Sequence, residues 1–139
     1  MATENAEDYL ERIHELIEAK GSARVVEIAE ALGLAQASVS QMVKKLASRG
    51  YLVYEKYRRI TLTPEGERVA KTIVRRHQVL SNFFEQLGVD AASAKRDIEG
   101  IEHHLSPSVL SRLENLTRLL RENPQLRKQL DGYRHLSKL

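Results

Sequence analysis

The sequence contains no cysteine, and this absence removes several classes of function at once. Without thiols the chain cannot form disulfides, thiolate zinc sites or iron–sulfur clusters, and it has no cysteine nucleophile. Any metal site must therefore be built from oxygen and imidazole ligands.

Long apolar runs are absent as well. No stretch approaches the roughly 20 residues that a membrane-spanning helix needs. The first ten residues, MATENAEDYL, are acidic where a secretory signal is basic and then apolar. With 42% hydrophobic and 29% charged residues, the composition is that of a folded soluble protein. We therefore expect a cytoplasmic protein that has no membrane partner.

The charge is distributed unevenly along the chain, although the net charge of +3 is unremarkable. Basic residues outnumber acidic ones from Lys20 to Arg59, whereas residues 1–19 are strongly acidic. A basic segment is typical of nucleic-acid binding, and an acidic segment attracts cations. The two halves of this pattern suggest different partners for neighbouring parts of the protein.

Apolar residues at helical spacing predict three short helices that end at Gly21, Gly33 and Gly50. After Gly50 the period changes to two, which predicts a two-stranded hairpin with a charged tip. The segment VVEIAEALGLAQASVSQMVKKL has small and apolar residues where two crossing helices need them, at Ala29 and Val39. Together these features predict a winged helix-turn-helix domain over residues 1–63.

Helix-start signals predict an all-helical second domain over residues 64–139. Thr63 precedes Pro64, Asp90 precedes a helix that we expect to reach Leu105, and Ser106 precedes a sixth helix. A last short helix begins after Asn123. The predicted fold class is therefore mainly α, with a winged helix-turn-helix followed by an all-helical domain.

The second helix of the helix-turn-helix would present one face to the major groove of DNA. Placing Val39, Val43 and Leu46 inward exposes the opposite face, where Gln41 is the best candidate for reading a base edge. A winged helix used only for protein contacts is the alternative. The predicted DNA-binding residues are Ala37, Ser40, Gln41, Lys44 and Lys45 on the helix, and Lys56, Arg58 and Arg59 at the hairpin tip.

Three separated stretches carry side chains that are suited to metal binding. Asp8 and Glu11 stand at i, i+3 on the first helix, and His77 falls in the apolar stripe of the long helix. On the next helix, three such groups flank a buried stripe, where carboxylates are costly unless a cation neutralises them. The candidate metal ligands are Asp8, Glu11, His77, Glu99, Glu102 and His103.

The charges of these six groups match two divalent cations, since four carboxylates and two neutral imidazoles balance four positive charges. Hard oxygen and imidazole ligands without sulfur suit manganese, and less specifically ferrous iron, zinc or cobalt. The sequence therefore predicts a site for two divalent cations, for which manganese is the first candidate.

The winged helix, the junction TPEGE, the histidine of VRRHQVL and the run DIEGIEHHLS together resemble the diphtheria-toxin-repressor family of metal-dependent repressors, in particular its manganese-responsive branch. The resemblance implies a homodimer, in which the all-helical second domain is the dimerisation domain, that binds an inverted repeat in operator DNA and represses manganese uptake genes. It assigns a binuclear metal site, with two Mn²⁺ ions for each subunit, to the same six residues. An iron-responsive repressor of the same family is the closest alternative.

Two readings from other classes predict different partners. A small di-metal hydrolase also uses paired carboxylates and histidines, but it needs an open cleft and a further general base, and none is visible. A winged-helix sensor of small organic ligands needs a roomy apolar pocket instead of carboxylates. The favoured reading is a transcription factor that is not an enzyme and has no small organic substrate.

Overall fold

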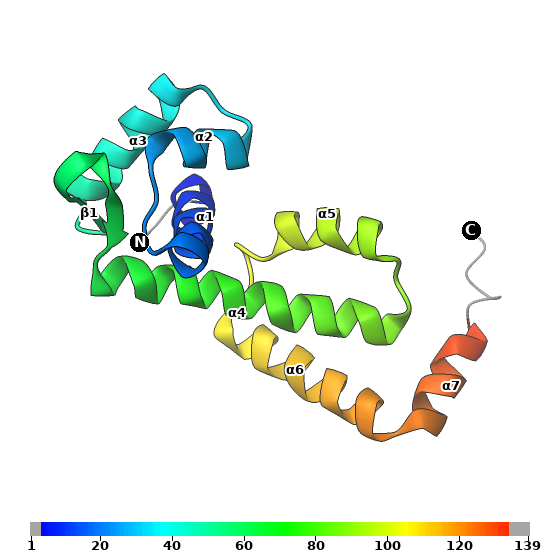
Figure 1. Ribbon diagram of the computed structural model, residues 1–139. Coiled ribbons are helices and arrows are strands. Elements are labelled where there is room, and N and C mark those ends of the chain that lie inside the picture. Colours follow the sequence, from blue (N-terminus) through cyan, green and yellow to red (C-terminus); the bar gives the residue numbers. More distant parts are fainter. Residues whose placement is uncertain (1–3, 134–139) are drawn as a thin grey trace. The chain divides into compact units, whose positions relative to one another are not determined.

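The computed structural model describes residues 4–133, apart from the side chains of Glu4 and Lys56. The chain forms two compact units, Met1–Val74 and Arg75–Leu139. The boundary between them, after Val74, falls within one long helix, α4 (Pro64–Leu87) (Figure 1). The division expected after residue 63 lies before the start of that helix. No helix among the described residues is long and apolar enough to cross a membrane.

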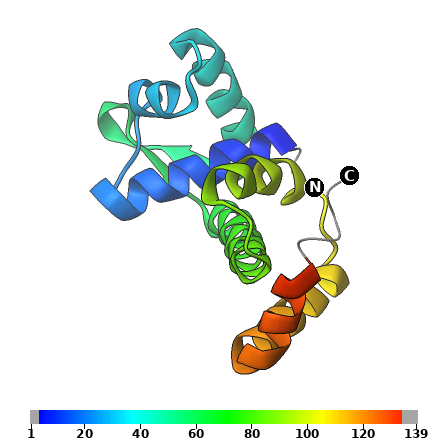
Figure 2. The same ribbon diagram turned by 90° about the vertical axis from the view of Figure 1, so that its right-hand side faces the viewer.

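The first unit contains three complete helices, a hairpin and the beginning of α4, which contributes Ala70 to the shared core (Figures 1 and 2). The elements before α4 are α1 (Glu4–Lys20), α2 (Val25–Leu32), α3 (Gln36–Ser48), β1 (Leu52–Tyr54), a 3-10 turn η1 (Lys56–Arg58) and β2 (Ile60–Leu62). Leu10 and Ile13 of α1, Ile28 of α2 and Ile60 of β2 are all 0% exposed. Burying a side chain of this size stabilises the fold by about 1.5–3 kcal/mol.

The predicted winged helix-turn-helix is confirmed. Gly33 ends α2 with a φ of 67°, a left-handed conformation that residues with a side chain rarely adopt. The strands pair antiparallel with Leu52 opposite Leu62, and Ile60 also pairs with Ala23 through two backbone hydrogen bonds of 2.8 and 3.2 Å.

The tip of the hairpin is conformationally unusual. Tyr57 and Arg58 have φ values of 64° and 59°, and neither is glycine. The left-handed region costs about 1–2 kcal/mol for most residues, whereas asparagine tolerates it. The Tyr57 side chain gains little from packing, because the residue is 83% exposed.

We therefore expect Tyr57→Asn to raise the free energy of unfolding by about 1 kcal/mol. Tyr133 supplies a matched control, since it is 64% exposed and has an ordinary φ of −80°. Tyr133→Asn should leave the urea midpoint unchanged. A Tyr57→Asn protein that is no more stable than the Tyr133→Asn protein would contradict the assigned strain.

The second unit contains the end of α4 together with α5 (Ala91–Ile101), α6 (Pro107–Glu122) and α7 (Pro124–Gly132). α5 runs back along the second half of α4 (Figure 1). Leu80 of α4 packs with Ala94 and Ile98 of α5, and Leu113 of α6 joins them. The expected all-helical arrangement is confirmed over the described residues.

The three predicted helix caps are also confirmed. The Thr63 hydroxyl accepts a hydrogen bond from the Gly66 N–H at 3.1 Å, and the Asp90 carboxylate accepts one from the Ser93 N–H at 2.9 Å. These hydrogen bonds lower the pKa of Asp90. The Ser106 hydroxyl accepts one from the Val109 N–H at 3.2 Å.

One predicted helix boundary is wrong. We expected the helix after Asp90 to continue through Leu105, but α5 ends at Ile101. Pro107 disfavours a helical conformation at Ser106, whose ψ is 154°, so the chain must leave the helix before that residue. The residues between form a turn in which the His104 N–H bonds to the Ile101 carbonyl at 2.9 Å.

Candidate functional site

Glu102 is the centre of a cluster of candidate metal ligands in the second unit. It caps the C-terminal end of α5, and its N–H bonds to the Ile98 carbonyl at 2.8 Å. The residue is only 1% exposed. A carboxylate this deeply buried needs a compensating positive charge or several hydrogen bonds.

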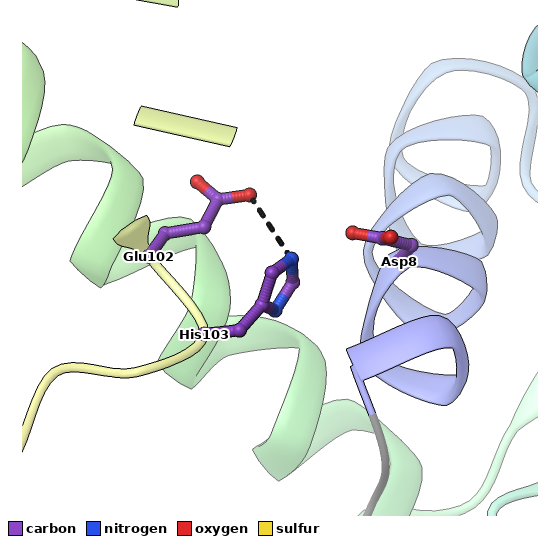
Figure 3. A group of neighbouring side chains, drawn as sticks. All are labelled: Asp8, Glu102 and His103. Atoms are coloured by element: carbon purple, nitrogen blue, oxygen red, sulfur yellow. Dashed lines mark ion pairs between the residues drawn. The ribbon is translucent and has the colours of Figure 1, made fainter. Parts of the chain in front are cut away.

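Each oxygen of the Glu102 carboxylate faces a different imidazole. Oε2 lies 2.9 Å from Nδ1 of His77, and Oε1 lies 3.7 Å from Nε2 of His103. Figure 3 shows the second of these contacts, and it also draws Asp8 on α1. One carboxylate therefore takes part in two carboxylate–imidazole pairs, both of which contain ligands suited to a divalent cation.

The two histidines differ in exposure. The His103 side chain is 2% exposed, whereas that of His77 is 41% exposed. The sequence placed His77 within the apolar stripe of α4, and the structure places it at the edge of that stripe. It meets Glu102 because the turn after α5 brings the carboxylate alongside α4.

The other three predicted ligands occupy different settings. Asp8 and Glu11 are half-buried on α1, in the first unit. Glu99 lies on α5, one turn before Glu102, and its side chain is exposed. Within the second unit, therefore, the described cluster contains His77, Glu102 and His103 and does not include Glu99. These residues fit a divalent cation, because they combine a buried anionic oxygen ligand with two imidazole nitrogens.

The predicted DNA-binding residues lie mainly on the exposed side of α3 and at the hairpin tip. Val39, Val43 and Leu46 are 0% exposed, so the inward face of α3 is as expected. Ser40 is half-buried, and the side chain of Lys56 lies outside the described part of the chain. The exposed members of the predicted set are Ala37, Gln41, Lys44, Lys45, Arg58 and Arg59.

Two family models match the sequence. Residues 1–60 match the N-terminal DNA-binding domain of the iron-dependent repressors, and residues 63–131 match their metal-binding and dimerisation domain. The chain belongs to this family. The repressor is therefore a metal-dependent transcriptional regulator that binds operator DNA as a homodimer. It is not an enzyme, which excludes the hydrolase reading.

Individual relatives of the repressor are similar along most of its length. The HTH-type transcriptional regulator MntR of Lysinibacillus sphaericus strain C3-41 is 49% identical over 132 residues, which cover 95% of each chain. The solved structure of the metal-dependent transcriptional regulator MtsR matches with a TM-score of 0.75 and 29% identity over 83% of this chain. That of the manganese regulator SloR matches with a TM-score of 0.73 and 30% identity over 84% of it. The repressor spans only 54% and 55% of these two solved chains.

Proposed function

We propose that this repressor responds to manganese and binds two Mn²⁺ ions in each subunit. The observation that carries the proposal is the buried Glu102 carboxylate, whose two oxygens face two different imidazoles. Glu102, His77 and His103 would hold divalent cations in the second unit, and the cations would supply the positive charge that this buried carboxylate needs. Relatives that include a manganese regulator support the choice of metal, and the six candidate ligands, none of which contains sulfur, agree with it.

Asp8, Glu11 and Glu99 complete the proposed binuclear site. Asp8 and Glu11 are separated by one helical turn on α1 and thus project from one side of that helix. Glu99 stands one turn before Glu102. The four carboxylates and the two imidazoles then balance two divalent ions, so the loaded site is electrically neutral.

The distribution of the ligands between the two units supplies the regulatory mechanism. The unit that carries α3 contributes Asp8 and Glu11, and the other unit contributes the remaining ligands. Bound cations supply positive charge that lets these carboxylates share one site instead of repelling one another. Bound metal would restrict the relative orientations of the two units. This restriction favours dimers in which the recognition helices α3 of the two subunits are about 34–36 Å apart, the spacing of the half-sites in an inverted repeat. A tenfold gain in operator affinity needs a coupling free energy of only about 1.4 kcal/mol between metal binding and DNA binding.

The homodimer has a suitable contact surface on α6. Leu110 and Leu120 face the interior of the unit, while Val109, Leu116 and Leu119 on the adjoining face are 42–48% exposed. We infer that this exposed apolar face contributes to dimerisation. The regulated genes are proposed to be those of manganese uptake, and the repressor would act where operator DNA lies, in the cytoplasm.

Metal titration of the full-length protein tests this function. We expect Mn²⁺ to bind with a stoichiometry of two ions per subunit in calorimetry and to increase operator affinity in an anisotropy assay. Each site should add about 2.7 kcal/mol to the free energy of unfolding when free Mn²⁺ is 100 times its Kd. A chelator should reverse both effects.

The same titration with Fe²⁺ under anaerobic conditions separates the manganese reading from the iron-responsive alternative. Stronger activation by Fe²⁺ than by Mn²⁺ at equal free concentration would contradict the manganese assignment. A stoichiometry of one ion per subunit would contradict the binuclear site.

A further inference from the structure

A small hollow lies between α4 and α6 within the second unit. Its volume is about 240 Å³, which is below the roughly 300–1,000 Å³ of sites that take drug-sized organic ligands. The hollow therefore fits a small ion or one end of a larger molecule. It shares no residue with the candidate metal site. Its lining residues are Val79 and Asn82 of α4, and Glu114, Thr117, Arg118 and Arg121 of α6.

The hollow combines a buried floor with a cationic rim. Val79 and Thr117 are only 6% and 4% exposed, whereas Arg118 and Arg121 are exposed. The two arginines are three positions apart on α6 and therefore lie on one face of that helix. Two guanidinium groups thus stand beside one hollow.

The charges of these two guanidinium groups are available to a ligand. Over residues 4–133, neither Arg118 nor Arg121 has an ion-pair partner. Glu114, the acidic residue of the lining, is itself paired, because Nη2 of Arg75 lies 3.3 Å from its Oε2. The Arg75 charge offsets that of Glu114, so the hollow has an excess of two positive charges.

Asn82 adds a hydrogen-bond donor from the opposite helix. Its Oδ1 accepts a hydrogen bond from Nε2 of Gln78 at 3.1 Å. Because the amide oxygen faces Gln78, the amide nitrogen of Asn82 can donate to a ligand. The hollow therefore offers N–H donors from both α4 and α6.

The number of charges and donors favours a phosphate group. A carboxylate or a phosphodiester has one negative charge and two free oxygens. A phosphate monoester has about −1.5 to −2 charges at pH 7 and three acceptor oxygens, and inorganic phosphate has a similar charge. Each guanidinium can bind two oxygens at once. Only the more highly charged phosphate groups match two guanidinium groups and a further donor.

We propose that this hollow binds a phosphate group, held by Arg118 and Arg121 on α6 and by the amide nitrogen of Asn82 on α4. A ligand held from both helices fastens α6 to α4 and stabilises the folded second unit. The arginines lie on the side of α6 away from the exposed apolar residues Leu116 and Leu119. A homodimer formed through that apolar face leaves the hollow open.

Calorimetry on the full-length, metal-free protein in a chloride buffer tests the site. We expect inorganic phosphate to bind with a stoichiometry of one per subunit, and acetate to bind at least about tenfold more weakly. The double variant Arg118→Gln/Arg121→Gln should bind phosphate about 100-fold more weakly, because each lost charge-assisted contact costs about tenfold or more. Arg96→Gln removes an exposed arginine of α5 outside the hollow and should bind phosphate like the wild type.

A second variant tests the contribution of α4 without changing the shape of the hollow. Asn82→Asp keeps an oxygen for the Gln78 hydrogen bond but replaces the amide donor with an anionic oxygen. Phosphate affinity should fall by about tenfold or more. Asn115→Asp makes the same change at an exposed position of α6 outside the lining and should have no such effect.

Three results would overturn the proposal. They are the absence of saturable phosphate binding in the wild type, wild-type phosphate affinity in the double arginine variant, and equal losses in Asn82→Asp and Asn115→Asp. Equal thermal melting of all variants without phosphate verifies that each one is folded.

Titration with glycerol 3-phosphate identifies the source of the phosphate group. Tighter binding of inorganic phosphate assigns the hollow to the free ion, and tighter binding of the ester assigns it to a phosphorylated metabolite. Because these titrations contain no metal, they do not depend on which cation activates the repressor. The double arginine variant keeps all six candidate metal ligands and should bind Mn²⁺ like the wild type.

Discussion

Replacing Glu102 by glutamine should reduce Mn²⁺ affinity by at least about 100-fold and abolish metal-dependent operator binding. Glutamine preserves the volume of the side chain but removes its negative charge and one of its two ligand oxygens. Because the two Glu102 oxygens face His77 and His103 separately, the substitution affects both candidate ion positions. Calorimetry measures the loss of metal binding, and anisotropy with operator DNA measures the loss of regulation.

Adjacent histidines provide a matched control for the same site. His103 has a 2% exposed side chain beside Glu102, whereas His104 is exposed. His103→Ala should weaken Mn²⁺ binding strongly, while His104→Ala should leave it unchanged. Wild-type metal affinity in Glu102→Gln, or equal losses in the two histidine variants, would contradict the proposed centre.

Replacing Gly66 by alanine should destabilise the first unit by more than about 3 kcal/mol. Gly66 lies buried in the first turn of α4, and a Cβ atom there would overlap the carbonyl oxygen and carbon of Tyr51. That carbonyl cannot easily move, because it accepts a hydrogen bond from the Thr63 N–H at 3.1 Å. The Tyr51 N–H is also bonded, to the Leu46 carbonyl at the end of α3 at 3.0 Å.

Gly100 is the matched control for this substitution. It lies within α5, and a Cβ atom at its position would meet nothing within 4 Å. Gly100→Ala should therefore stabilise the protein by about 0.5–1 kcal/mol, through the better helix propensity of alanine. Urea unfolding of the two variants measures the contrast. A Gly66→Ala protein within 1 kcal/mol of the wild type would show that the Tyr51 carbonyl can move aside.

The local signals of the sequence predicted most of the secondary structure. The caps at Thr63, Asp90 and Ser106 and the left-handed Gly33 depend on a few neighbouring residues, so their effects are readable without tertiary information. The change of period after Gly50 located the hairpin for the same reason. The wrong boundary at Leu105 arose because the apolar spacing continues past Ile101, although the backbone has to turn before Pro107.

The candidate metal centre was only partly predictable. Residue type and helical spacing selected His77, Glu102 and His103 from the sequence, and the structure brings these three together. The sequence did not reveal that Glu99 is exposed while Glu102 is buried. The two residues are three positions apart and flank the same apolar stripe, so the pattern treats them alike.

The amino-acid sequence by itself determined the helices, their caps, the winged helix-turn-helix and the chemical types of the metal ligands. Each of these depends on residues within a few positions of one another, where propensity, capping and apolar period act directly. Tertiary structure decided that Glu102 lies between two imidazoles and that Gly66 lies against the Tyr51 carbonyl. Those features require segments distant in the chain to pack together, and a one-dimensional pattern does not specify which surfaces meet.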